Sequence, residues 1–86
     1  MSNYEVEFTT SAYKELKKLF PQQRLSIVRA IDKLHLNPRL GNVRTMIGIK
    51  SWRLRVGDYR VVYDILDNRL LVIIIRVRHR EDAYRH

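Results

Sequence analysis

The sequence of 86 residues contains 17 Lys and Arg against 9 Asp and Glu, which gives a formal net charge of +8. This length favours one domain over residues 1–86, and the longest apolar run, LLVIII, is far shorter than the roughly 20 residues of a membrane span. The charge favours polyanionic partners, namely nucleic acid, the ribosome surface or an acidic protein, over a basic surface that binds nothing.

The N-terminal half predicts one strand and two helices. Its first residues, MSNYEVEF, lack the basic and apolar regions of a signal peptide, and there is no cysteine, so we expect a cytoplasmic protein without disulfides. Residues 3–8 alternate apolar and polar side chains, which predicts a strand. Thr9 then caps a helix, and Pro21 begins a second helix that ends at Asn37-Pro38. We expect these helices to pack as an antiparallel pair.

The C-terminal half predicts three strands. Residues 39–51 contain two glycines and show no clear period, which predicts a loop with at most one short extended piece. The segments WRLRV and YRVVYDI flank Gly57-Asp58, a two-residue hairpin signal, and LDNRL turns the chain into LLVIIIRV. The apolar run of this last segment predicts a central strand covered on both faces. The predicted fold is therefore α+β, with an N-terminal strand, a helical hairpin and a three-strand antiparallel meander.

Three arginines are expected on one face of the predicted hairpin. A two-residue loop places Val56 opposite Tyr59 and Arg55 opposite Arg60, so alternation turns the apolar side chains toward the helices and Arg53, Arg55 and Arg60 away from them. Like charges opposite each other destabilise a sheet by about 0.2–1 kcal/mol, so stability alone would favour Glu or Thr there. Either these arginines extend into water, or they bind a phosphodiester, whose oxygens match guanidinium forks.

The C-terminal segment RVRHREDAYRH follows the apolar strand with further basic and aromatic residues: Arg76, Arg78, His79, Arg80, Tyr84 and Arg85. A basic strand end followed by an aromatic residue is consistent with RNA backbone contacts and base stacking. Alternation does not decide whether Arg78 or Arg80 faces the hairpin arginines.

Histidine is the one residue type here that titrates near neutral pH, so His79 is either a candidate to move a proton or, like most single histidines, structural or exposed. The spacing of His35, His79 and His86 does not fit metal ligands, so we expect no metal site. No nucleophile motif, phosphate-binding loop or dinucleotide fingerprint is evident, so we expect no cofactor. Any catalysis should therefore rest on basic residues.

The order of these segments, with WRLRVGDYRVVYDI and VRHREDAY, resembles the RelE/ParE toxin superfamily over almost the whole chain, and more closely its RelE branch of ribosome-dependent mRNA endonucleases. The resemblance implies a RelE-like microbial RNase fold and a cytoplasmic toxin of a type II toxin–antitoxin system, neutralised by a RelB-like antitoxin. It also implies metal-independent cleavage of mRNA in the ribosomal A site, in which the ribose 2′-hydroxyl attacks the adjacent phosphate. This cleavage would inhibit translation.

The resemblance implies roles for individual residues. Arg53 and Arg55 fall where RelE-type toxins often have lysines, and the arginines of the site would stabilise a phosphorane-like transition state. Because guanidinium hardly deprotonates, His79 becomes the leading candidate for the general base, with Tyr84 behind it. The expected catalytic residues are thus Arg53, Arg55, Arg60, His79, Arg80 and Tyr84, and the expected RNA-binding residues are Arg76, Arg78 and Arg85.

Two other functions fit the same sequence. A ParE-like toxin shares the fold but inhibits DNA gyrase, and the presence of Arg60, Arg80 and Tyr84 argues against it. A non-catalytic basic module would bind RNA or an antitoxin and would have no cleavage rate to lose.

Overall fold

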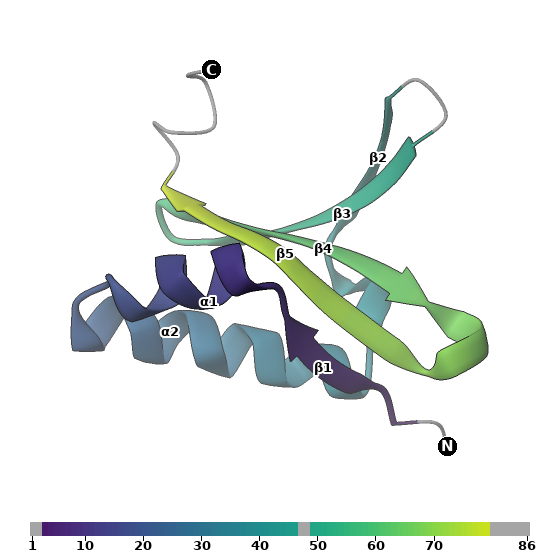
Figure 1. The fold of residues 1–86 in the computed structure, drawn as a ribbon, viewed down its shortest axis with the longest axis horizontal. Coiled ribbons are helices and arrows are strands. Elements are labelled where there is room, and N and C mark those ends of the chain that lie inside the picture. Colours follow the sequence, from purple (N-terminus) through teal and green to yellow (C-terminus); the bar gives the residue numbers. More distant parts are fainter. Residues whose placement is uncertain (1–2, 47–48, 80–86) are drawn as a thin grey trace.

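A computed structural model describes residues 3–46 and 49–79 of the chain (Figure 1). The helices are α1 (Thr10–Lys17) and α2 (Pro21–Asp32), and the strands are β1 (Glu5–Phe8), β2 (Asn42–Met46), β3 (Ile49–Val56), β4 (Tyr59–Leu66) and β5 (Leu71–His79). Short 3-10 helices connect them: η1 (Lys33–His35), η2 (Pro38–Leu40) and η3 (Asp67–Arg69). In these described ranges no helix combines the length and the apolar character that crossing a membrane requires.

The strands form one sheet in the order β1-β5-β4-β3-β2, in which only β1 and β5 are parallel neighbours. Helices α1 and α2 run in opposite directions along one face of this sheet, which confirms the α+β fold (Figure 1). The meander has four strands instead of the predicted three, because the short extended piece allowed within residues 39–51 is a strand, β2, that pairs with β3. β2 is an edge strand whose Val43 is exposed, so it lacks the alternation that a half-buried strand shows.

The hydrophobic core lies between the two helices and the helix-facing side of the sheet. The predicted register of the hairpin is confirmed, since Val56 pairs with Tyr59 and Arg55 with Arg60. Gly57 has a positive φ of 58°, which a two-residue hairpin loop requires at its first position. The buried residues of this core are Ala12, Leu16, Ile27, Ile31, Leu34, Val61, Tyr63, Val72, Ile74 and Val77.

Strand β5 lies between β1 and β4, as its apolar run predicts, but it is not covered on both faces. Val72 and Ile74 are fully buried against the helices, whereas Ile73 and Ile75 are only half-buried. The expectation of cover on both faces is wrong because the helices pack on one face alone.

Strand β5 also contains a β-bulge at Ile75. The consecutive β4 residues Val62 and Tyr63 pair with Arg76 and Ile74, so Ile75 is an extra residue. A bulge reverses the alternation of the side chains that follow it. The β5 side chains of the hydrophobic core accordingly change from the even-numbered Val72 and Ile74 before the bulge to the odd-numbered Val77 after it. The arginines at the end of the strand are thereby turned away from the core.

Thr9 connects the start of α1 to this bulge. Its hydroxyl accepts a hydrogen bond from the Ala12 N–H at 3.1 Å, which confirms the predicted N-cap. The same hydroxyl donates to the Ile75 carbonyl at 2.9 Å, and the Thr9 N–H donates to the Ile74 carbonyl at 2.9 Å. The residue that begins the helix therefore also satisfies backbone groups at the irregular point of β5.

Tyr63 fixes the segment before β2 to the sheet. Its buried hydroxyl donates to the Pro38 carbonyl at 2.7 Å and accepts from the Gly41 N–H at 3.1 Å. Burial raises the pKa of Tyr63, and the hydrogen bond from Gly41 partly opposes this shift. A Cβ atom at Gly41 would lie 2.5 Å from the Arg53 carbonyl oxygen and 2.8 Å from the Tyr63 hydroxyl. The close approach of this segment to β3 therefore requires glycine.

Replacing Tyr63 with Phe should lower the free energy of unfolding by about 1–3 kcal/mol, because the Pro38 carbonyl and the Gly41 N–H lose their buried partner. Urea unfolding followed by circular dichroism measures the change. Tyr59→Phe is the matched control, since its hydroxyl contact to Gln23 is exposed and 3.5 Å long; its loss should stay below about 0.5 kcal/mol. Equal losses in the two variants would contradict the anchoring role of Tyr63.

Asp67 joins separate parts of the chain at the surface. It accepts a hydrogen bond from the Tyr4 hydroxyl at 2.7 Å and forms an ion pair with Arg39. The Arg39 guanidinium also lies over the Trp52 ring, 5.9 Å from its centroid. The hydrogen bond from Arg39, followed by that from Tyr4, lowers the pKa of Asp67. The charged form of Asp67 therefore favours the folded state.

The Asp67→Asn variant should have a lower Tm than the wild type near neutral pH. Because the folded-state pKa lies below the ordinary value of 3.8, the stabilisation is fully present above that value and is lost as the pH falls through the folded pKa. The Tm difference should therefore shrink as the pH is lowered below about 4. Scanning fluorimetry between neutral pH and about pH 3 measures it, with Asp58→Asn in the exposed hairpin loop as control. A difference that is constant with pH would refute this account.

Candidate functional site

Arginines of β3, β4 and β5 form two rows on the sheet face opposite the helices. In one row, Arg55, Arg60 and Arg78 are neighbours in register on adjacent strands. In the other row, Arg53 and Arg76 flank Val62. Adjacent strands lie about 4.8 Å apart, so these side chains share a small surface. We name it the arginine face, defined by Arg53, Arg55, Arg60, Arg76 and Arg78.

The arginine face contains two adjoining hollows. One, of about 200 Å³, is lined by Asn42, Arg53, Arg55 and Arg60. The other, of about 110 Å³, is lined by Arg53, Arg60, Val62, Arg76 and Arg78. Because Arg53 and Arg60 line both, they lie at the centre of the arginine face. Larger hollows of about 390 and 250 Å³ adjoin the helices, and none of the described residues that line them is an arginine.

Several of these guanidinium groups are available to an anion. Among the described residues, no Asp or Glu lines either hollow. Over residues 3–46 and 49–79, Arg55 and Arg60 make no ion pair or side-chain hydrogen bond within the chain. Concave surfaces of one charge attract counter-ions, and planar guanidinium groups match the oxygens of a phosphate. The arrangement is therefore suited to bind a phosphate group.

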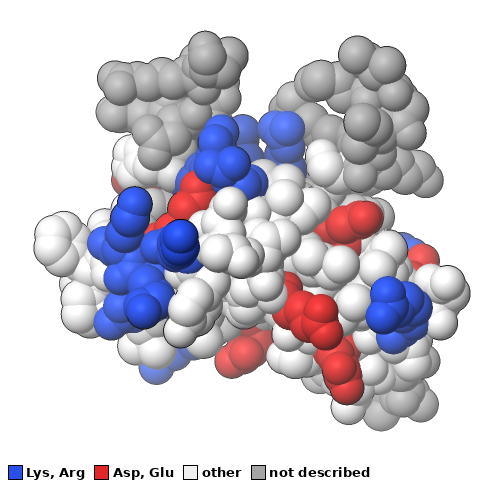
Figure 2. All heavy atoms as spheres, in the orientation of Figure 1, with Lys and Arg blue, Asp and Glu red and all other residues white. Residues whose placement is uncertain are grey.

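The charge is unevenly distributed over the rest of the surface. In Figure 2 a group of Lys and Arg side chains covers the side of the molecule that carries the turn between α1 and α2, while most Asp and Glu lie toward the other side. The last turn of α1, which precedes this turn, contains the basic residues Lys14 and Lys17. A polyanion therefore meets positive charge on the helical side as well as on the arginine face.

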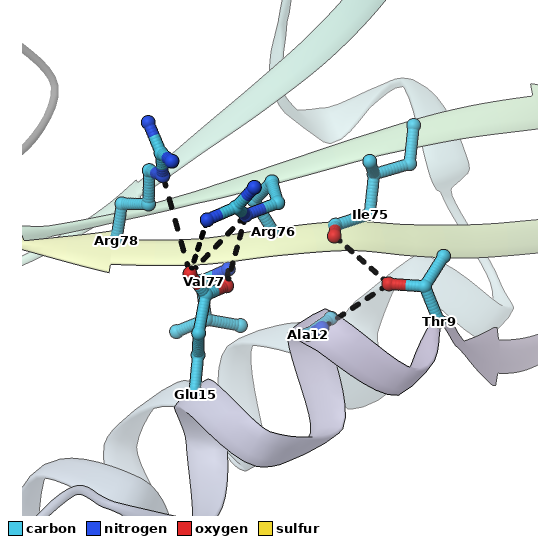
Figure 3. Close-up of polar contacts among 7 residues, drawn as sticks. All are labelled: Thr9, Ala12, Glu15, Ile75, Arg76, Val77 and Arg78. Carbon is cyan, nitrogen blue, oxygen red and sulfur yellow. Dashed lines mark hydrogen bonds and ion pairs between the residues drawn. The ribbon is translucent and has the colours of Figure 1, made fainter. Parts of the chain in front are cut away.

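Glu15 on α1 contacts the two arginines of β5 (Figure 3). Its carboxylate accepts hydrogen bonds from Arg76 Nη2 at 2.8 Å and from Arg76 Nε at 3.2 Å, and Arg78 Nε lies 4.0 Å away. The side chains of Arg76 and Arg78 are still 39% and 37% exposed, so they border the hollow while one carboxylate holds them from the side.

His79 does not join the arginine face. It pairs with Tyr59, and the two rings meet edge to face with centroids 5.1 Å apart. Tyr59 packs against the core, so this contact places His79 on the helix-facing side of the sheet. The reason is the bulge, which gives Arg76 and Arg78 one face and His79 the other. The sequence interpretation that grouped His79 with the arginines is thus not supported by the geometry.

The other predicted site residues, Arg80, Tyr84 and Arg85, lie outside the described residues, and their roles stay predictions. Among residues 3–46 and 49–79, no group of three or more His, Asp or Glu side chains lies close enough together to hold a metal ion.

Sequence reasoning missed Asn42 and Glu15. Asn42 fell in the predicted loop, and only its pairing with Arg53 in β2 places it at the hollow. Glu15 is the one acidic residue between Phe8 and Ile31, in a segment otherwise rich in Lys and Arg. An isolated acid in a basic helical segment was a usable signal that it faces an internal cation.

Comparison with known proteins gives consistent matches over nearly the whole chain. A family model described as "ParE toxin of type II toxin-antitoxin system, parDE" matches residues 6–84. Toxin RelG of Mycobacterium tuberculosis is 38% identical over 84 residues, which cover 95% of this chain and 97% of RelG. The mRNA interferase toxin RelE of Escherichia coli is 30% identical over 80 residues, which cover 91% of this chain and 84% of RelE.

Solved structures show the same likeness in three dimensions. The crystal structure of the toxin–antitoxin complex RelBE2 from Mycobacterium tuberculosis contains a chain with a TM-score of 0.83 and 36% identity, and the match covers 93% of this chain and 94% of that one. In the intact RelBE toxin–antitoxin complex of Escherichia coli the TM-score is 0.73 at 28% identity, over 88% and 95% of the two chains. The chain therefore belongs to the RelE/ParE toxin superfamily and is a RelE-type toxin of a toxin–antitoxin system.

Proposed function

We propose that this toxin is an endoribonuclease that cleaves mRNA in the ribosomal A site, acts without a metal ion and inhibits translation. The observation that carries the proposal is the pair of hollows on the arginine face. Arg53 and Arg60 line both hollows, so a phosphate bound there would be surrounded by guanidinium groups. The name of the related Escherichia coli protein, mRNA interferase toxin RelE, supports RNA as the substrate.

The proposed reaction is an internal transesterification of the RNA. The ribose 2′-oxygen forms a bond to phosphorus while the bond to the 5′-oxygen breaks, which leaves a 2′,3′-cyclic phosphate and a 5′-hydroxyl end. The phosphorane-like transition state carries more negative charge on its oxygens than the phosphodiester. Arg53, Arg55 and Arg60 would donate hydrogen bonds to these oxygens and stabilise the transition state more than the substrate.

The 2′-hydroxyl must lose a proton, and the 5′-oxygen must gain one. Guanidinium groups stay charged at any working pH and do not accept the first proton. His79 lies on the other side of the sheet, so in this proposal the acceptor is not His79. Of the candidates that the sequence indicates, Tyr84 remains: as a phenolate it would accept the 2′-hydroxyl proton, while a water molecule would protonate the leaving 5′-oxygen. Its ring would also stack on a base.

The remaining arginines are proposed to bind the RNA on either side of the scissile phosphate. Arg76 and Arg78 border the smaller hollow and would contact a neighbouring phosphate. Arg80 and Arg85 would extend this path along the C-terminal segment. Such contacts position the RNA but do not read its sequence, which suits an enzyme whose message is presented by the ribosome.

We further propose that a RelB-like antitoxin neutralises the toxin. Several similar structures are RelE–RelB complexes, and the net charge of +8 favours an acidic partner that covers the arginine face. The antitoxin would supply an acidic or amphipathic segment that blocks the phosphate-binding hollows.

Replacing Arg60 with Ala should lower the rate of mRNA cleavage on programmed ribosomes by about 100-fold, because Arg60 lines both hollows. Ribosome association should weaken by less than about tenfold, since one phosphate contact among several is lost. Primer extension on the message and ribosome pelleting measure the two quantities. Arg29→Ala removes the same charge from an exposed position of α2 and should leave cleavage unchanged.

Full cleavage by Arg60→Ala would remove this residue from the mechanism. A wild-type protein that binds ribosomes but cuts no message would favour the non-catalytic basic module. The matching family description names ParE, so a parallel assay of DNA gyrase supercoiling is the third arm. Inhibition of gyrase without mRNA cleavage would establish the ParE-like alternative.

A further inference from the structure

In the described part of the chain, the end of β5 has no neighbouring strand on one side. β1 pairs with residues 71–74 of β5 and then stops at Phe8, whereas β5 continues to His79. Unpaired backbone groups along such an edge would otherwise depend on water or attract another chain. The segment that follows β1 takes over from it: the Thr9 hydroxyl donates to the Ile75 carbonyl, and the Glu15 carboxylate accepts from the Val77 N–H at 2.8 Å (Figure 3).

Glu15 does more than complete this edge. The same carboxylate binds Arg76 through Nη2 and Nε, and it lies near the Nε atom of Arg78. One side chain thus contacts the backbone of Val77 and the guanidinium groups on both sides of it. Its exposed fraction is 24%, so the charge is partly shielded from water and interacts more strongly than a surface carboxylate.

The charge of Glu15 is not needed to complete the strand edge. A neutral oxygen acceptor, such as the amide of Gln, would satisfy the Val77 N–H equally well. The negative charge instead matters for the arginine face, where Arg78 lies opposite Arg60 in register and Arg76 shares a hollow with Arg53. Mutual repulsion would drive a long side chain such as Arg76 away from this cluster. A carboxylate at the side opposes that movement without entering either hollow.

We propose that Glu15 is a positioning residue of the RNA-cleaving site, which holds Arg76 in the orientation that receives a phosphate; this inference rests on the proposed function. An arginine that is already oriented loses less conformational entropy when RNA binds. The Nε and Nη2 atoms of Arg76 are directed to Glu15, and in the part of the chain that is described Nη1 makes no hydrogen bond. Both N–H groups of Nη1, and the second N–H of Nη2, are therefore left to bind the RNA.

The test is Glu15→Gln in the full-length toxin. The Gln oxygen keeps the bond from the Val77 N–H, but its NH₂ group faces the N–H groups of Arg76 and cannot bind them. Single-turnover cleavage of mRNA on programmed ribosomes should fall by about tenfold, since displaced contact groups typically cost one to two orders of magnitude. Glu7→Gln changes the net charge equally at an exposed position of β1 and should cleave like the wild type.

A double-mutant cycle separates positioning from a general structural role. If Glu15 acts through Arg76, Glu15→Gln should change the cleavage rate by less than about threefold in an Arg76→Ala background. Effects that multiply in the double variant, or wild-type cleavage by Glu15→Gln, would overturn the proposal. Thermal unfolding of Glu15→Gln checks that the rate does not fall merely because less protein is folded; a rate that recovers fully once the folded fraction is corrected also overturns it.

A binding assay distinguishes failure of this inference from failure of the proposed nuclease function. A short 2′-O-methyl RNA, which cannot be cleaved, is titrated into each variant and followed by fluorescence polarisation. Glu15→Gln should bind it about fivefold more weakly than Glu7→Gln, although the net charges are equal. If the wild type cuts no message but this difference persists, the nuclease proposal fails and the positioning role of Glu15 stands. Equal binding by the two variants shows that Glu15 does not position Arg76 for RNA.

Discussion

The β-bulge at Ile75 is the constraint on which the rest of the arrangement depends. Without this extra residue, strict alternation would carry Arg76 and Arg78 to the side occupied by Val72 and Ile74, and the helices would pack on two charges. With it, Val77 completes the core and the arginines join those of the hairpin. Residues of α1 and its N-cap stabilise the bulge, because Thr9 and Glu15 form hydrogen bonds with the backbone groups beside it.

The arginine face contains like charges on neighbouring strands, an arrangement that ordinarily destabilises a sheet. A row in which Arg55, Arg60 and Arg78 are adjacent brings like charges together on three strands. The opposite side of the same strands carries Val61, Tyr63 and other buried residues, so the core stabilises what the charges destabilise. Such a local conflict between stability and side-chain choice is typical of functional sites.

The sequence was sufficient to predict the register of the hairpin, but it was insufficient to predict which way the side chains at the end of β5 point. Gly57-Asp58 determined the register of β3 and β4, and with it the common face of Arg53, Arg55 and Arg60. The bulge could not be predicted because it is stabilised by contacts from α1, more than 60 residues away along the chain. Alternation therefore did not decide whether Arg78 or Arg80 faces the hairpin arginines, and it could not show that His79 lies on the helix-facing side. β2 was predicted only as one short extended piece within a loop, because an exposed edge strand leaves little pattern.

The crowding of the arginine face also links the stability of the toxin to its surroundings. Any solute that binds a native surface and not the unfolded chain shifts the folding equilibrium toward the native state. Because the repulsion among Arg55, Arg60 and Arg78 exists only when the sheet is formed, multivalent anions such as sulfate relieve a strain specific to the folded toxin. A toxin whose arginine face holds a bound anion is therefore more stable, and less open to proteolysis, than the same toxin with that face empty.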